Sequence, residues 1–191
     1  MQQHSGSNPA HKAILLDRDG VINVKLPQDR YVCTPEEFEF VPGAIEALLL
    51  LRDLGFLLVV ITNQRGIALG CHNKDDLNKV HEHMGEVLLK NGVALDAIYY
   101  CPHDSIEHCE CRKPAPGMIF SACQDLELDL ANSYMVGDSP SDIEAGRKAG
   151  SMTVKIGEGQ DCEADLIFPS LLDFAVFLRE RGLSRSVIKN G

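Results

Sequence analysis

The sequence lacks three features that would place a protein at a membrane or on nucleic acid. No apolar run approaches the roughly 20 residues that a membrane-spanning helix needs. The opening stretch MQQHSGSNPAHK has neither the basic segment nor the apolar segment of a secretory signal peptide. Basic residues are also few, since 18 lysines and arginines face 28 acidic residues and leave a formal net charge of −10. This balance disfavours partners such as nucleic acid and anionic membranes, and we expect a cytoplasmic protein.

The length and composition are those of one globular domain. The chain has 191 residues, of which 45% are hydrophobic and 24% are charged. It contains no internal repeat, low-complexity tract or interdomain linker. We therefore expect a polar tail over residues 1–12, a single domain over 13–183 and a C-terminal tail over 184–191. We also expect a monomer.

Short β-prone runs alternate with segments of helical periodicity. This alternation predicts an α/β fold, in which a parallel sheet carries helices on both faces. Ligands of such sheets bind outside the carboxyl ends of the strands. The predicted strands are 13–17, 56–62, 96–101, 134–138, 153–156 and 165–168, and the predicted helices are 41–55, 73–92, 116–126, 141–150 and 170–181.

Three of the seven cysteines gather with a histidine in the stretch CPHDSIEHCECRKP, residues 101–114. Cys101, His103, Cys109 and Cys111 have the spacing C-x-H-x5-C-x-C, which predicts a tetrahedral zinc site with three thiolates and one imidazole. Four protein ligands leave no position for water, so the predicted zinc is structural. His108 is the alternative ligand within this loop, and we expect it to be a bystander. We call residues 101–113 the zinc loop.

Acidic residues follow two of the predicted strands. Asp17 and Asp19 lie in the run LLDRDG, where the first predicted strand ends. Asp138 ends the run MVGD, and Asp142 lies near the start of the next predicted helix. Converging carboxylates offer the hard oxygen ligands that Mg²⁺ prefers. Each motif alone also has a simpler explanation: D-R-D-G can be a solvated turn, and Asp142 can be an acid favoured by the helix dipole.

Two further segments carry polar groups suited to a phosphate. VVITNQRG places Thr62 at a strand end, where a hydroxyl and backbone N–H groups can hold a phosphate oxygen. Taken alone, this motif favours the simpler interpretation that Thr62 only ends the strand. Arg112 and Lys113 follow the last predicted zinc ligand directly. We therefore predict that the structural zinc fixes the loop and thereby positions this basic pair.

Taken in order, D-x-D-G, T-N, R-K-P and G-D-x3-D resemble the haloacid dehalogenase-like (HAD) phosphohydrolases over about residues 13–170. The resemblance implies a Rossmann-like sheet and, because no long insertion is visible, no large cap domain. It implies that Asp17 is a nucleophile that becomes phosphorylated and that Asp19 is the general acid/base. Thr62 and Lys113 would hold the phosphoryl group. The Mg²⁺ ligands it implies are Asp17, Asp19 and Asp138.

The zinc-loop motif narrows the resemblance to the group that includes histidinol-phosphate phosphatase and D-glycero-D-manno-heptose-1,7-bisphosphate 7-phosphatase. The segments IYYCPH, RKPAPGM and SYMVGD are most similar to the heptose family. One departure is Ser139, where members of the group often have lysine directly after the metal-binding aspartate. The substrate contacts that the resemblance implies are Asn23, Arg30, Tyr31, Asn63, Gln64, Arg65 and Arg112.

The resemblance therefore implies a Mg²⁺-dependent phosphatase that removes the 7-phosphate of a heptose bisphosphate, a small soluble substrate, during synthesis of nucleotide-activated heptose for bacterial lipopolysaccharide. Histidinol phosphate is the nearest alternative substrate, and a polynucleotide 3′-phosphate is a second. A non-catalytic zinc-binding module is the alternative from another class, but it would leave the acids at the strand ends without a role.

Overall fold

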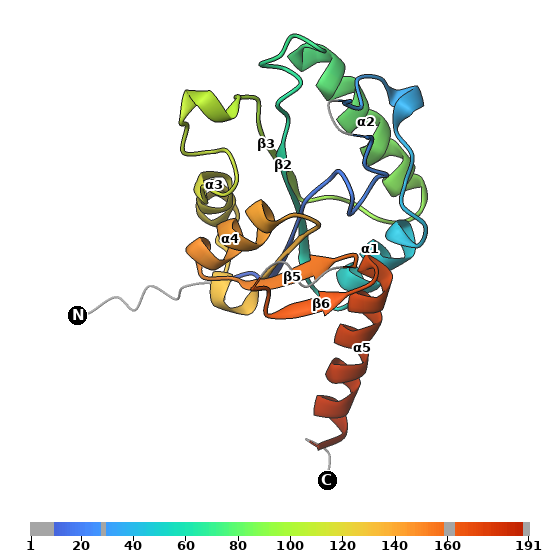
Figure 1. Ribbon diagram of the computed structural model, residues 1–191. Coiled ribbons are helices and arrows are strands. Elements are labelled where there is room, and N and C mark those ends of the chain that lie inside the picture. Colours follow the sequence, from blue (N-terminus) through green and yellow to red (C-terminus); the bar gives the residue numbers. More distant parts are fainter. Residues whose placement is uncertain (1–9, 28–29, 159–162, 189–191) are drawn as a thin grey trace, which may run out of the picture.

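A parallel six-stranded sheet forms the centre of the computed structural model, which describes residues 10–27, 30–158 and 163–188 (Figure 1). The strand order is β3-β2-β1-β4-β5-β6, and every neighbouring pair is parallel. All six predicted strands are present, with ends that differ by a residue. The strands are β1 (Ala13–Leu16), β2 (Leu57–Asn63), β3 (Ala97–Cys101), β4 (Tyr134–Gly137), β5 (Met152–Ile156) and β6 (Leu166–Phe168).

Helices cover both faces of the sheet, as predicted (Figure 1). Successive residues of β1 point to opposite faces, so Ile14 and Leu16 belong to one core and Ala13 and Leu15 to the other. The first core includes side chains of α1, α2 and α5, and the second includes those of α3 and α4. The helices are α1 (Ala44–Asp53), α2 (Lys74–Lys90), α3 (Gly117–Leu126), α4 (Pro140–Ala149) and α5 (Leu171–Ile188).

Regular backbone structure extends beyond the predicted start of the first strand and the predicted end of the last helix. The backbone N–H of Leu57 donates to the carbonyl of Lys12 at 2.9 Å, and that of His11 donates to Glu127 at 2.9 Å. Residues 11 and 12 therefore belong to the fold because they continue the hydrogen bonding of β1, whereas residues 1–9 of the predicted tail lie outside the described residues. Helix α5 runs to Ile188, past the predicted end at residue 181. Its backbone continues through Gly182, a residue that weakens a helix but does not have to end it.

The sheet has its switch point between β1 and β4. The chain leaves β1 toward β2 on one side and returns to β4 on the other, so the loops after these strands diverge and leave a crevice at their carboxyl ends. Asp17, Thr62 and Asp138 lie at these strand ends. In the described part of the chain, the only regular elements in the loops that follow β1, β2 and β3 at this edge are the short 3-10 turns η1 (Pro35–Glu37) and η2 (Ser105–Glu107).

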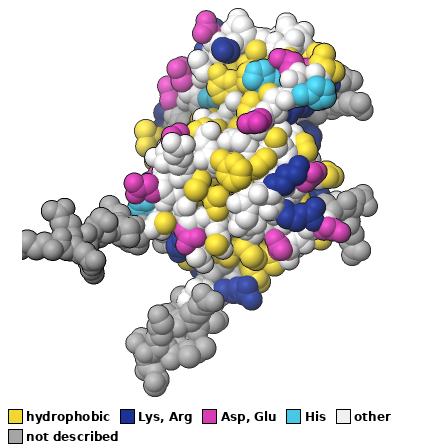
Figure 2. Space-filling view, turned by 90° about the vertical axis from the view of Figure 1, so that its left-hand side faces the viewer, with side chains coloured by type: hydrophobic (Ala, Val, Ile, Leu, Met, Phe, Trp, Pro, Cys, Tyr) yellow, Lys and Arg dark blue, Asp and Glu magenta, His cyan; other side chains and the backbone are white. Residues whose placement is uncertain are grey.

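The face of the molecule shown in Figure 2 carries side chains of mixed character. On the side shown in Figure 2, a few lysine and arginine side chains lie among acidic, apolar and uncharged ones. None of the described helices is both long enough and apolar enough to cross a membrane.

Candidate active site

A polar cavity of about 370 Å³ opens at the switch point. Its walls come from the loop after β1, the turn after β2, the zinc loop and the start of α4. Acids and bases predominate in its lining, so the cavity suits a small charged ligand. The charged residues of its lining are Asp17, Arg18, Asp19, Lys25, Arg30, Arg65, Arg112, Lys113, Asp138 and Asp142.

Asp17 lies directly after β1 at the floor of this cavity. Its Oδ1 accepts a hydrogen bond of 2.8 Å from Nζ of Lys113. Burial raises the pKa of the Asp17 carboxyl to about 7; the Lys113 ammonium opposes this rise, and the carboxylates of Asp142 and Asp19 add to it. A carboxylate in contact with a buried cation can act as a nucleophile toward an electrophilic phosphorus.

Lys113 joins the zinc loop to the catalytic floor. Its buried ammonium contacts Asp17, Oδ1 of Asp142 at 2.6 Å and the carbonyl of Ile61 at 2.7 Å. Burial alone would lower the pKa of Lys113, but the carboxylates of Asp17 and Asp142 raise it above its ordinary value. Asn63 holds the Lys113 backbone on both sides, since its side-chain amide donates to the carbonyl and its Oδ1 accepts from the N–H, both at 3.1 Å.

Three carboxylates converge where the sequence predicts a magnesium ion. Oxygen atoms of Asp17, Asp138 and Asp142 lie within 4.8 Å of one another. Oδ1 of Asp138 is buried and has no hydrogen-bond partner among the described residues, which suits a metal ligand. Gly20 makes this convergence possible: it has a φ of +96°, and a Cβ there would lie 2.5 Å from Oδ2 of Asp138. The donor set therefore fits Mg²⁺.

Asp142 is the residue of this group that sequence reasoning did not assign. It lies in the first turn of α4, and its side chain is fully buried. Its Oδ2 accepts hydrogen bonds from the hydroxyl and the N–H of Ser139, at 2.6 and 3.0 Å, so Asp142 also caps the helix as the simpler explanation expected. The spacing G-D-x3-D was the available signal. Asp142 belongs to the site because its buried carboxylate contacts the ammonium of Lys113.

Asp19 occupies a separate position beside the three converging carboxylates. Both of its oxygens accept from Nη2 of Arg18, at 2.9 and 3.0 Å, and each also accepts from a side-chain amide, that of Asn23 at 3.0 Å or that of Gln64 at 3.1 Å. Burial would raise the pKa of Asp19, but Arg18 and these hydrogen bonds lower it below its ordinary value. The structure thus does not bring the Asp19 carboxylate into the group of candidate metal ligands that contains Asp17.

A buried polar layer supports Asp19. Arg18 is 1% exposed, and its Nη1 lies 3.3 Å from Nε2 of His81. Burial first, and then the Arg18 charge, lower the pKa of His81 to about 3, so the ring is neutral and Nε2 accepts from Arg18. Gln64 also donates to Oγ1 of Thr62 at 2.9 Å. Thr62, Gln64 and Asn23 are buried, so the structure places these three predicted contacts behind the cavity wall.

The remaining predicted substrate contacts line the cavity wall. Arg30, Tyr31, Arg65 and Arg112 all face the cavity. Arg65 also binds the zinc loop through a two-pronged salt bridge with Asp104, with distances of 2.7 and 3.1 Å. Arg112 makes a hydrogen bond within the loop, donating to the carbonyl of His103 at 3.2 Å. Sequence reasoning gave no sign of the contact between Arg65 and Asp104.

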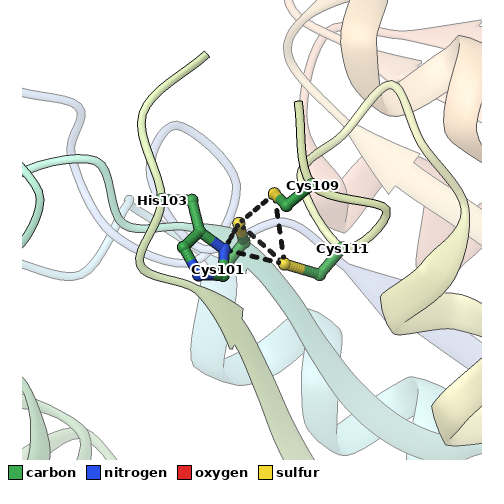
Figure 3. A group of neighbouring side chains, drawn as sticks. All are labelled: Cys101, His103, Cys109 and Cys111. Atoms are coloured by element: carbon green, nitrogen blue, oxygen red, sulfur yellow. Dashed lines mark hydrogen bonds between the residues drawn. The ribbon is translucent and has the colours of Figure 1, made fainter. Parts of the chain in front are cut away.

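The cysteine and histidine side chains of the zinc loop point toward one centre (Figure 3). Their sulfur atoms lie 3.0–3.5 Å apart, and Nδ1 of His103 lies 3.2 Å from Sγ of Cys111 and 3.5 Å from that of Cys101. Four soft or borderline donors around one point fit Zn²⁺. His108 lies outside this group of four. Cys101 ends β3, so a bound metal would tie the loop to the sheet.

Curated relatives match this chain along almost its whole length. It is 39% identical to the D-glycero-β-D-manno-heptose-1,7-bisphosphate 7-phosphatase of Pasteurella multocida strain Pm70, over 88% of this chain and 97% of the relative. It is 37% identical to the D-glycero-α-D-manno-heptose-1,7-bisphosphate 7-phosphatase of Campylobacter jejuni, over 90% of this chain and 98% of the relative.

A family model and a solved structure agree with these relatives. The model described as HAD-hydrolase-like matches residues 110–175. The crystal structure of D,D-heptose 1,7-bisphosphate phosphatase from B. bronchiseptica, complexed with magnesium and phosphate, is 34% identical with a TM-score of 0.82, covering 89% of this chain and 99% of that chain. The chain therefore belongs to the heptose-1,7-bisphosphate 7-phosphatase family of HAD-like phosphatases.

Proposed function

We propose that this protein hydrolyses the 7-phosphate of D-glycero-D-manno-heptose 1,7-bisphosphate through an aspartyl-phosphate intermediate. The observation that carries the proposal is the contact of Lys113 with Asp17 beside Asp138, at the switch point of the sheet. The near full-length similarity to phosphatases named for this substrate supports the choice of sugar. The same relatives do not favour the histidinol-phosphate alternative.

In the first step, a carboxylate oxygen of Asp17 attacks the phosphorus, and the bond between phosphorus and the sugar oxygen breaks. Asp19 donates a proton to the leaving alkoxide. Magnesium, when bound by the carboxylates of Asp17 and Asp138, neutralises the charge of the phosphoryl oxygens. Lys113 adds a fixed positive charge in contact with Asp17 and Asp142.

In the second step, water hydrolyses the aspartyl phosphate. Asp19 accepts a proton from this water, phosphate leaves, and the Asp17 carboxylate is regenerated. The lowered pKa of Asp19 suits its base role in this step, while its acid role requires a proton to be taken up before the first step. Arg18, Asn23 and Gln64 hold the Asp19 carboxyl at the edge of the cavity and thereby set its direction.

Substrate selection rests on the cavity wall. Arg112 and Arg30, which line the cavity, would bind the second phosphate, and Tyr31 would contact the sugar. Arg65 contributes by holding Asp104 of the zinc loop in place. Thr62, Gln64 and Asn23 act on the substrate through Asp19 and the backbone around it, since their side chains are buried. Asn63 fixes Lys113.

The zinc site is structural in this proposal. Cys101, His103, Cys109 and Cys111 would hold Zn²⁺ with no position left for a reacting water. The loop that they close ends in Arg112 and Lys113, and both reach the cavity. We further propose that the protein acts in the cytoplasm as a monomer without nucleic-acid partners, in the synthesis of nucleotide-activated heptose.

The direct test is phosphate release with Mg²⁺ from both anomers of heptose 1,7-bisphosphate, from histidinol phosphate and from fructose 1,6-bisphosphate. We expect one heptose anomer to exceed the last two substrates at least a hundredfold in kcat/KM, which is about 2.7 kcal/mol of transition-state preference. Asp17→Asn is the control, and its activity should vanish on every substrate. A higher kcat/KM for histidinol phosphate would contradict the proposal.

A further inference from the structure

Lys25 is a second lysine at the phosphoryl site, and it comes from a different segment than Lys113. It follows the D-R-D-G turn and lines the cavity. Its Nζ lies 2.6 Å from Oδ2 of Asp138, across 113 positions of sequence. The N–H of Val24 donates to the carbonyl of Glu39 at 2.8 Å, so the backbone that precedes Lys25 is anchored. The lysine is thus held at the rim and directed inward.

The two lysines divide the three converging carboxylates between them. Lys113 contacts Asp17 and Asp142, and Lys25 contacts Asp138. The side chain of Lys113 is 2% exposed, whereas that of Lys25 is 55% exposed. Lys113 is therefore held by its two carboxylate partners at the floor of the cavity. The more exposed Lys25 has room to turn from Asp138 toward a ligand that enters the cavity.

The residue next to Asp138 supplies no cation on this side of the site. Ser139 is neutral, and its hydroxyl is occupied with Oδ2 of Asp142 at 2.6 Å and with the hydroxyl of Ser141 at 2.9 Å. A phosphoryl group on Asp17 would bring additional negative charge next to Asp138. Among the described residues, Asp138 has an ammonium contact with Lys25, whose Nζ lies 2.6 Å from Oδ2 of Asp138. Charge balance at this side of the group therefore depends on the loop after β1.

We propose that Lys25 is a phosphate-binding residue, whose ammonium donates to the oxygen of the transferred phosphoryl group that faces Asp138. This inference rests on the proposed function in one respect, because it takes Asp17 as the seat of the phosphoryl group. Lys25 then supplies, from the loop after β1, the cation that Ser139 lacks. The free phosphate product should meet the same contact as the phosphoryl group of the substrate.

Binding of inorganic phosphate tests this role without any assumption about the sugar. The dissociation constant would be measured by titration calorimetry, in the presence of Mg²⁺, for the zinc-replete protein and its variants. We expect Lys25→Met to weaken phosphate binding at least tenfold, and Lys25→Arg, which keeps the charge, to remain within about threefold of the parent protein. Lys90→Met, which removes an exposed lysine of α2, is the matched control and should change nothing.

Two results would overturn the inference. One is a Lys25→Met protein that binds phosphate within twofold of the parent protein. The other is a Lys25→Arg protein that is as weak as Lys25→Met, because the loss would then reflect loop geometry and not charge. A protein that leaves heptose bisphosphate intact but binds phosphate in a Lys25-dependent way would contradict the proposed substrate alone.

Discussion

At the scale of single residues, buried charge is the dominant feature of this site. Asp17, Asp142 and Lys113 are all largely removed from water, and each depends on the others for compensation. Removing a carboxylate from such a group loses a contact with Lys113 but also relieves repulsion between neighbouring carboxylates. The raised pKa of Asp17 shows that for this residue burial and repulsion outweigh the attraction of Lys113. Effects on stability and on catalysis should therefore differ between Asp17, the proposed nucleophile, and Asp142, which contacts Lys113.

Replacement of Asp17 by asparagine should stabilise the magnesium-free protein, and more so as the pH rises. The raised pKa means that the folded state retains the Asp17 proton up to about pH 7, whereas the unfolded chain loses it near 3.8. Stability is therefore lost progressively between these values. The Tm difference between Asp17→Asn and the parent protein, in magnesium-free buffer, should be small at pH 5 and larger at pH 7.5. A difference independent of pH would refute this account.

Replacement of Asp142 by alanine should lower the free energy of unfolding by about 3 kcal/mol, the cost typical of breaking a buried ion pair. The change removes the partner of Lys113 and the cap of α4 together. Denaturant unfolding would measure it, with Glu144→Ala as the control on the same helix, since Glu144 forms an exposed pair with Lys148. Similar losses in the two variants would show that the buried pair contributes no more to the free energy of unfolding than the exposed pair does.

At the scale of elements, the zinc loop is fixed to the body by more than its predicted metal. Arg65, in the turn after β2, binds Asp104 with two hydrogen bonds, and Asp104 directly follows the ligand His103. Asp104 also caps η2 through its side chain and accepts from the N–H of Ser105. The turn after β2 and the zinc loop are therefore joined directly by this salt bridge beside the cavity.

Breaking this salt bridge should loosen the zinc loop. Arg65→Ser and Asp104→Asn should each speed the loss of zinc to a chromogenic chelator, by roughly threefold if the partly exposed pair is worth about 0.7 kcal/mol. The double variant should be no faster than either single one, because both changes remove the same contact. Arg147→Ser, which removes an exposed pair with Glu163 on another surface, is the control. Additive effects in the double variant would argue against the coupling.

At the scale of the whole molecule, the sheet and the zinc loop have different sources of stability. The sheet has two apolar cores, one under each layer of helices. Three of the predicted zinc ligands, Cys101, Cys109 and Cys111, lie at the second core, but most of the packing in both cores is between side chains of the strands and helices. The zinc loop has no strand or helix longer than η2 among its described residues. Metal loss should therefore release the loop and leave the parallel sheet in place.

Removal of zinc should abolish activity while most of the secondary structure remains. A chelator strips both metals, so the informative step is the return of Mg²⁺ alone. Protein that has lost only magnesium should recover fully, and protein that has also lost zinc should stay inactive until zinc is restored. Circular dichroism would follow the fold in parallel. Full activity of the zinc-free protein in Mg²⁺ would contradict a role for the metal in placing Arg112 and Lys113.

The sequence by itself determined the features that depend on local spacing. The alternation of strands and helices predicted the parallel sheet, and C-x-H-x5-C-x-C predicted four donors that lie together, because close neighbours in a short loop have few ways to diverge. Family resemblance supplied the roles of Asp17 and Lys113. Their contact, which joins two segments 96 positions apart, became visible only with the sheet assembled.

Only the tertiary structure decided which side chains face one another across that sheet. In the structure, Asp142 belongs to the group of converging carboxylates, whereas Asp19 lies beside that group. Arg65 forms a salt bridge with Asp104, and Lys25 forms one with Asp138. These contacts join the loops after different strands, and the order of the strands puts those loops together. The physical reason is that the sequence pattern specifies only the direction of a side chain relative to its own strand. Which charges pair depends on the residues that follow the neighbouring strand in the sheet.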